Sequence, residues 1–127
     1  SAASDVYKRQ STNTAMDHIN KNIQSSDAII SGEIYTYFHT SYYNHTNKEI
    51  MLLKPKEELG WVGEWGLIKK LNTPKISSLE SVKSPRIWLI LREKTYDEYK
   101  KQVPPYWQLR QEFHDGDLII GLYVNKL

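Results

Sequence analysis

The sequence contains no cysteine among its 127 residues. Disulfide bonds, thiolate nucleophiles and zinc–thiolate sites are excluded, because each needs a cysteine sulfur. Long apolar runs are missing too. The longest, residues 87–91 and 118–124, have the length of a β-strand and fall short of the ~18 residues typical of a membrane span. No segment of this sequence is therefore expected to cross a membrane.

The sequence has no strong excess of one charge: 17 Lys and Arg nearly balance 15 Asp and Glu, for a net charge of +2. A protein that binds nucleic acid through a strong basic field needs a larger excess of positive charge. We therefore predict no nucleic-acid partner.

Phosphate-binding fingerprints are absent from the turn where an α/β fold would carry one. That turn, "IISGEIYTYF", has only Gly32, and the carboxylate of Glu33 would repel a phosphate. Neither G-x-G-x-x-G nor G-x-x-x-x-G-K-[ST] occurs, so no nucleotide cofactor is predicted.

Recognisable catalytic and metal-binding patterns are equally scarce. The four histidines form no H-x-x-x-H pair, and no serine lies in a G-x-S-x-G setting. The carboxylates lie beside lysines on segments that we expect to be solvated. Asn44-His45-Thr46 fits the N-x-[ST] acceptor pattern, but a match this short arises by chance. We therefore predict no catalytic residue and no metal site.

Hydrophobic periodicity predicts alternating helices and strands. Residues 13–27 predict an amphipathic helix, because Met16, Ile19 and Ile23 share one face. A second helix is expected over residues 33–45, with Ile34, Phe38 and Tyr42 on one face. Strands are predicted over 27–32, 48–54 and 84–93. Further helices are predicted over 73–82 and 94–103, and in the first of these Ile76, Leu79 and Val82 would face inward.

The end of the chain predicts a β-hairpin. Asp115-Gly116 separates two strand-like runs, and Leu118, Ile120 and Leu122 would share one face with Val124. Strand–helix alternation followed by a hairpin predicts an α/β fold: a three-layer sandwich with a mixed, Rossmann-like sheet closed by a C-terminal antiparallel hairpin. Residues 11–127 suit one domain.

The first ten residues, "SAASDVYKRQ", do not share this patterning. They match the translation of a transposon-end adaptor used in DNA sequencing libraries, so we interpret residues 1–10 as a non-native scar that packs against nothing specific. The gene fragment would then begin at Ser11, with further coding sequence upstream.

The segment "GWVGEWG" offers the most specific local cluster. Trp61 and Trp65 flank Glu64 on a glycine-rich loop, where the indoles could stack on a sugar while the carboxylate accepts its hydroxyl hydrogen bonds. The favoured alternative is that both tryptophans pack on the sheet edge or on a neighbouring part of the protein.

Residues 15–127 resemble the C-terminal extramembrane domain of multi-pass glycosyltransferases that use polyprenyl-phosphate sugars, the family of protein mannosyltransferase-like and aminoarabinose-transferase-like enzymes. The resemblance rests on the order of "AMDHINKNIQSSDAIISG", "TSYYNHTNKEIML", "WGLIKKL", "SPRIWLILRE" and "GLYVNKL". The 33–45 helix and the double-Trp loop match no signature of that family.

The resemblance implies a missing N-terminal multi-pass membrane domain and a location on the extracytoplasmic face of the cell membrane. It implies transfer of a sugar from a lipid-linked phosphate donor to a glycan or protein acceptor. The family's catalytic acidic residue lies in the membrane part, so this fragment would be non-catalytic and would hold no cofactor itself.

Two other functions stay open at this point. One is a stand-alone sugar- or peptide-binding module that uses Trp61, Glu64 and Trp65. The other is a small cytoplasmic α/β enzyme, which predicts a polar pocket at the carboxyl ends of the strands, near Gly32, Glu33 and Lys54.

Overall fold

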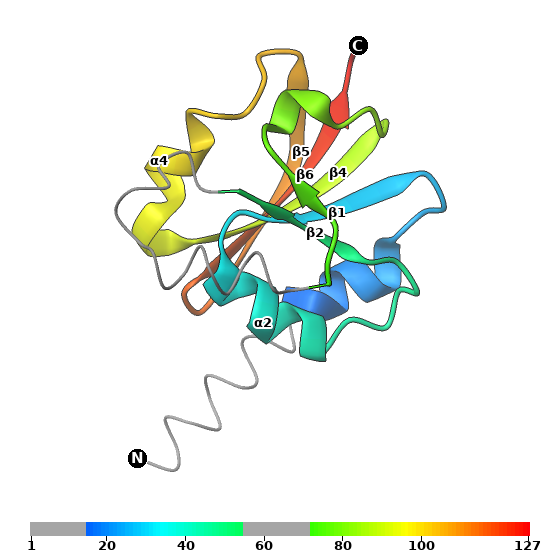
Figure 1. Ribbon diagram of the computed structural model, residues 1–127, viewed down its shortest axis with the longest axis vertical. Coiled ribbons are helices and arrows are strands. Elements are labelled where there is room, and N and C mark those ends of the chain that lie inside the picture. Colours follow the sequence, from blue (N-terminus) through cyan, green and yellow to red (C-terminus); the bar gives the residue numbers. More distant parts are fainter. Residues whose placement is uncertain (1–14, 55–71) are drawn as a thin grey trace.

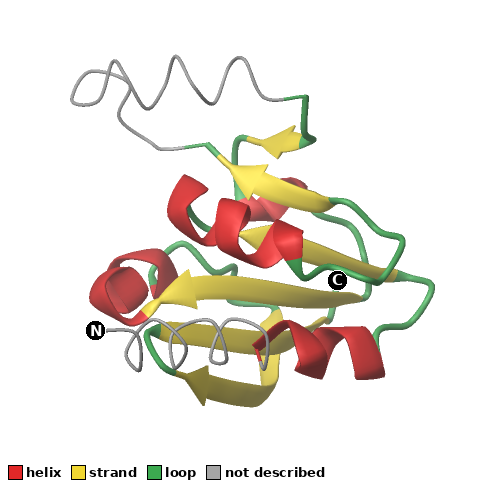
Figure 2. Ribbon diagram, turned by 90° about the horizontal axis from the view of Figure 1, so that it is seen from below, coloured by secondary structure: helices red, strands yellow, loops and turns green. Residues whose placement is uncertain are grey.

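A six-stranded mixed sheet forms the centre of the molecule. The computed structural model describes residues 15–54 and 72–127. The strand order is β3-β2-β1-β4-β6-β5, with the strands side by side in Figure 2. Strands β1 to β4 run parallel, whereas β6 runs antiparallel to both of its neighbours. The strands are β1 (Asp27–Ser31), β2 (Ile50–Leu53), β3 (Lys75–Ile76), β4 (Arg86–Arg92), β5 (Trp107–Asp115) and β6 (Leu118–Asn125).

Helices cover both faces of this sheet, which confirms the predicted three-layer α/β sandwich. One face carries the helical residues 15–22 and α2 (Ile34–Tyr42), and α4 (Tyr96–Lys100) lies on the other side (Figure 1). The second face also carries the short 3₁₀ helices η1 (Leu79–Ser81) and η2 (Glu93–Thr95). Each face has its own hydrophobic cluster.

Strand β4 shows why a nearly continuous apolar run is needed in the middle of such a sheet. Trp88 and Ile90 belong to the cluster under α2, while Ile87, Leu89 and Leu91 belong to the cluster under α4. All five are at most 2 % exposed. Because both faces of the strand are covered, both sets of alternating side chains must be apolar.

The C-terminal hairpin forms as predicted. Strands β5 and β6 are joined through Gly116 and Asp117, and Gly116 has φ 60°, a value that favours glycine. Leu118, Ile120 and Leu122 lie in one cluster, as their alternation predicts.

The first predicted helix is confirmed over its described part. Residues 15–22 are helical, Met16 and Ile19 are fully buried, and Ile23 packs against the same cluster. Within the described ranges, no helix is long and apolar enough to cross a membrane.

The predicted helix over 73–82 is wrong. The segment instead forms strand β3 and then η1. The backbone of β2 explains the difference, because Leu52 N–H donates to Pro74 O and Lys54 N–H donates to Ile76 O, both at 2.9 Å. The free edge of β2 thus holds the segment extended, although Leu79 still faces inward and is buried.

The predicted helix over 33–45 is confirmed as α2, but its larger rings do not face the sheet. Phe38 is 46 % exposed and Tyr42 81 %, whereas Thr36 and Thr40 are fully buried. The Thr40 hydroxyl donates to Thr36 O at 2.6 Å, and the Thr36 hydroxyl contacts that of Ser31 on β1. Two small side chains whose hydroxyls are satisfied locally therefore face the sheet, and the larger rings point elsewhere.

Candidate functional site

The carboxyl ends of β1 and β4 meet where the strand order reverses. The chain runs from β1 outward to β2 and β3, then returns to the other side of β1 as β4. In open α/β sheets, ligands bind in the crevice at such a switch point. The residues that follow β1 and β4 are therefore the first candidates for a site.

Glu33 and Arg92 face each other at this edge. Ser31 pairs with Ile90 in the parallel register, so two residues further along both strands bring Glu33 opposite Arg92. Arg92 Nε lies 2.9 Å from Glu33 Oε1, and Nη2 lies 3.0 Å from Oε2. The side chains are only 13 % and 25 % exposed. This is the two-pronged geometry in which guanidinium and carboxylate bind most strongly.

Neighbouring side chains complete the network. Thr95 Oγ1 donates to Glu33 Oε1 at 2.7 Å, and the Arg92 guanidinium lies over the Tyr35 ring at 4.7 Å. The hydrogen bond to Glu33 raises the pKa of Arg92. Partial burial raises the pKa of Tyr35, and the negative charge of Asp117 raises it further. The charges of Glu33 and Arg92 are thus paired with each other.

Gly32 is closed in from the opposite face of the sheet. A Cβ at this position would lie 2.6 Å from Leu91 Cδ2 and 3.3 Å from the Tyr99 ring. Its N–H donates to Ile90 O at 3.0 Å, so this backbone donor is already engaged. The position after β1 is filled by packing side chains.

The small-enzyme hypothesis can be compared with these contacts at the described residues. That hypothesis requires an open polar pocket near Gly32, Glu33 and Lys54. At Gly32 and Glu33 the structure places packed side chains and a satisfied ion pair instead. Lys54 follows β2, as predicted, and its N–H pairs with β3.

The opposite end of the same two strands carries a second ion pair. Asp27 is the register partner of Arg86, and their Oδ1 and Nε atoms lie 3.1 Å apart. The indole N–H of Trp88 donates to Asp27 Oδ2 at 2.9 Å, and the N–H of Gln24 donates to the same oxygen. Arg86 Nη2 also donates to Oδ2 at 3.2 Å, whereas Oδ1 makes no well-formed hydrogen bond although Arg86 Nε lies beside it. Asp27 is only 4 % exposed, and these contacts give it a structural role.

A polar cluster lies between α4 and the hairpin. Glu112 accepts hydrogen bonds from the Tyr96 hydroxyl at 2.6 Å and from His114 Nε2 at 2.8 Å. Burial alone would raise the pKa of Glu112, but these two bonds and the charge of Lys100 outweigh it and hold the pKa below its ordinary value. Lys100 donates to the Tyr123 hydroxyl at 3.1 Å. The cluster fastens α4 to the sheet, and we assign no chemistry to it.

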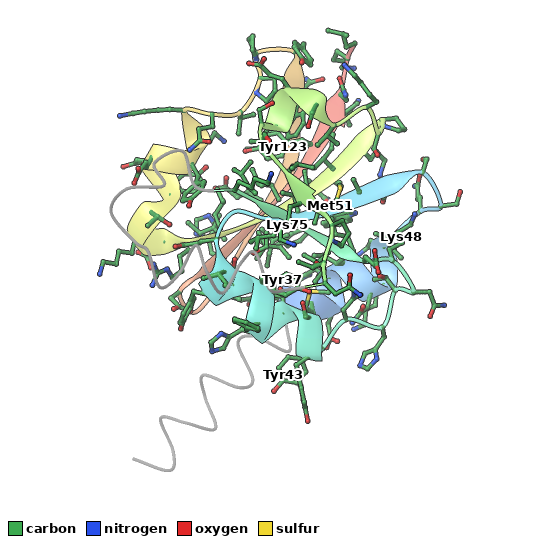
Figure 3. All side chains as sticks on the ribbon, in the orientation of Figure 1. Tyr37, Tyr43, Lys48, Met51, Lys75 and Tyr123 are labelled. Carbon is green, nitrogen blue, oxygen red and sulfur yellow. The ribbon has the colours of Figure 1, made fainter. Side chains whose placement is uncertain are left out.

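The outer face of α2 is the most exposed aromatic surface among the described residues. Tyr35, Phe38 and Tyr42 are 39 %, 46 % and 81 % exposed. Each ring is held by a neighbour: Tyr35 by His39, Phe38 by Tyr37, and Tyr42 by Tyr43, with centroids 4.5, 5.7 and 5.0 Å apart. Tyr37 and Tyr43, labelled in Figure 3, are partly buried against the core. Each exposed ring thus has one aromatic neighbour.

The residues of the N-x-[ST] match at Asn44 stabilise the loop that contains them. Asn44 Nδ2 donates to Lys48 O at 2.7 Å, and its Oδ1 accepts from the Thr46 N–H at 3.0 Å. Asn47 adopts a left-handed conformation with φ 66°. Asn44 and Thr46 thus have structural roles in a tight turn.

The glycan-contact candidates Trp61, Glu64 and Trp65 lie outside the described residues, as do residues 1–10. Among residues 15–54 and 72–127, no group of three or more His, Asp or Glu side chains could hold a metal ion.

Comparison with known proteins yields a fold. No family model and no curated protein matches the chain. A solved structure described as the 16S rRNA methylase RmtB is similar, with a TM-score of 0.52 and 11 % sequence identity over 97 % of this chain. The alignment covers 65 % of that protein, so the chain spans less than two thirds of its length. This likeness supports the Rossmann-like α/β architecture alone.

Proposed function

We propose that this chain is the non-catalytic extramembrane domain of a membrane glycosyltransferase. The whole protein would move a sugar from a polyprenyl-phosphate donor to a glycan or protein acceptor on the extracytoplasmic face. The family assignment comes from the sequence resemblance over residues 15–127, with which an α/β sandwich is compatible. Fold alone would not support it, because one fold hosts many functions.

The internal pairing of side chains at the carboxyl edge is the observation that carries the non-catalytic role. The Glu33–Arg92 pair, Thr95 and the packing around Gly32 occupy the place where a Rossmann-like domain would bind its ligand. Among the described residues of this edge, the polar side chains are paired with one another, which suits a role in packing and positioning.

Two observations weigh against a methyl-transfer function suggested by the rRNA methylase. Sequence identity of 11 % carries no activity across, and the near-neutral charge lacks the basic field expected of an RNA-binding surface. We therefore do not extend that neighbour's activity to this chain.

Sugar transfer by the full-length protein in membranes tests the proposal. We expect transfer from a radiolabelled polyprenyl-phosphate sugar, no transfer by the chain alone, and a rate within about twofold for full-length Glu33→Gln, a conservative change. Transfer by the chain alone would contradict the proposal, as would loss of transfer in a folded Glu33→Gln protein. Glycan binding by the chain that is abolished by Trp65→Ala would favour the stand-alone binding module.

A further inference from the structure

The turn between β5 and β6 is attached to elements on both faces of the sheet. Glu93 N–H, in η2, donates to Asp117 O at 2.8 Å. The Asp117 carboxylate adjoins Tyr35 of α2, whose pKa is raised first by burial and then by this negative charge. In Figure 1 the turn lies next to the start of α2. The turn therefore borders the carboxyl edge, where the Arg92 guanidinium lies over the same Tyr35 ring.

A histidine from the helix of residues 15–22 meets the end of β5 just before this turn. His18 Nε2 lies 3.2 Å from Asp115 Oδ2, and the side chains are 33 % and 21 % exposed. The His18 ring also stacks on Phe113, with centroids 4.1 Å apart and 17° between the planes. Asp115 Oδ2 is buried and makes no well-formed hydrogen bond within the described residues. A positive charge on His18 would compensate this buried carboxylate oxygen.

Other charged groups near His18 leave this pair as the distinctive one. On its own helix, Asp17 precedes His18 and Lys21 follows one turn later, so their charges act on it in opposite directions. On β5, His114 Nε2 lies 2.8 Å from Glu112 Oε1. Alternation along the strand places that second pair on the face of α4, opposite the face that carries the helix of residues 15–22.

We infer that the His18–Asp115 contact is a pH-sensitive latch that fastens the β5–β6 turn to the helix of residues 15–22. An ordinary histidine gains its positive charge as the pH falls through about 6.5. Below that pH the imidazolium compensates the buried carboxylate oxygen, whereas above it the carboxylate faces a neutral ring. The stabilisation is therefore present at low pH and is lost as the pH rises. The contacts of the turn with Tyr35 and Glu93 then loosen, at the border of the carboxyl edge.

Hydrogen exchange of the Glu93 amide reports the attachment of the turn, because this N–H donates to Asp117 O. We expect its protection factor, which corrects for the intrinsic effect of pH, to fall about two- to fivefold between about pH 5.5 and about pH 8. Carboxylates stay ionised over this range. The decrease should be absent from His18→Gln and from Asp115→Asn, since either change removes the ion pair.

His45→Gln is the matched control for these variants. His45 is exposed and has no carboxylate partner among the described residues, so its replacement should leave the decrease in Glu93 protection intact. A Glu93 protection factor that does not change with pH in the unsubstituted chain would overturn the inference. A decrease that persists in Asp115→Asn, or that is lost in His45→Gln, would overturn it as well.

Urea denaturation at the same two pH values separates the latch from simple packing. His18→Gln should raise the equilibrium constant of unfolding about two- to fivefold more at the lower pH than at the higher one. An effect that is equal at both pH values would assign His18 to stacking on Phe113 alone and would overturn the inference. None of these measurements depends on sugar transfer, so failure of the proposed function would be seen separately.

Discussion

The Glu33–Arg92 pair allows the stability of the closed carboxyl edge to be measured. The pair makes two charge-assisted hydrogen bonds of 2.9 and 3.0 Å, with side chains 13 % and 25 % exposed. Exposed pairs typically contribute 0–1 kcal/mol, and breaking a buried pair costs ~3–5 kcal/mol. With partial exposure, we expect a coupling energy of about 1.5–2 kcal/mol.

A double-mutant cycle of Glu33→Gln and Arg92→Met isolates this coupling. Urea denaturation of the four proteins gives their free energies of unfolding. Glu33→Gln should cost about 2 kcal/mol, because it removes the charge that both Arg92 nitrogens contact. Arg92→Met should cost slightly less, since Thr95 still donates to Glu33.

The double-mutant cycle has one decisive comparison. The double variant should be about as stable as Glu33→Gln alone, because the second substitution removes a guanidinium that has already lost its partner. A coupling energy below about 0.5 kcal/mol would refute it, since that value is typical of a solvated surface pair. The edge would then be open to water and to ligands.

Three further substitutions test other parts of the fold. Asp27→Ala should cost about 3–5 kcal/mol in urea denaturation, because it leaves the Trp88 indole N–H and a partly buried arginine without their carboxylate; a loss below 1 kcal/mol would contradict this. Gly32→Ala should cost about 1–3 kcal/mol through overpacking, whereas unchanged stability would mean that the crevice has room. Tyr96→Phe should cost about 1 kcal/mol at pH 7. Because the folded pKa of Glu112 lies below its ordinary 4.5, the stabilisation is present above that value and is lost as pH falls through the folded pKa; a cost that is equal at pH 3 would contradict the assignment.

The sheet could be predicted from the sequence because its strands are specified locally. The apolar run of β4 requires cover on both faces, and the Asp115-Gly116 dipeptide marks the turn before β6. The segment 73–82 could not be predicted in this way. Its apolar spacing suits a helix, and only the unpaired edge of β2, distant in sequence, extends it.

The face of α2 shows a different limit. Periodicity places Phe38 and Tyr42 on one face of the helix, and apolar faces usually turn to the core. The structure buries Thr36 and Thr40 because their hydroxyls find partners within the helix and on β1. Hydrophobic periodicity does not take such hydroxyl hydrogen bonds into account.

The sequence located the polar edge after β1, but it did not predict which side chains pair there. Gly32 and Glu33 were expected at a polar edge, and the roles of Arg92 and Thr95 were missed. A signal was present: Asp27 and Glu33 are separated by the same interval as Arg86 and Arg92. On two parallel strands in register this places an ion pair at each end, as the structure shows.

The uninterrupted genomic sequence upstream of Ser11 tests the central claim most directly. A chain that is the extramembrane domain of a membrane glycosyltransferase predicts one continuous reading frame. That frame should encode several apolar segments of about 20 residues and an acidic residue in an early extracytoplasmic loop. A short upstream frame without such segments would contradict the account.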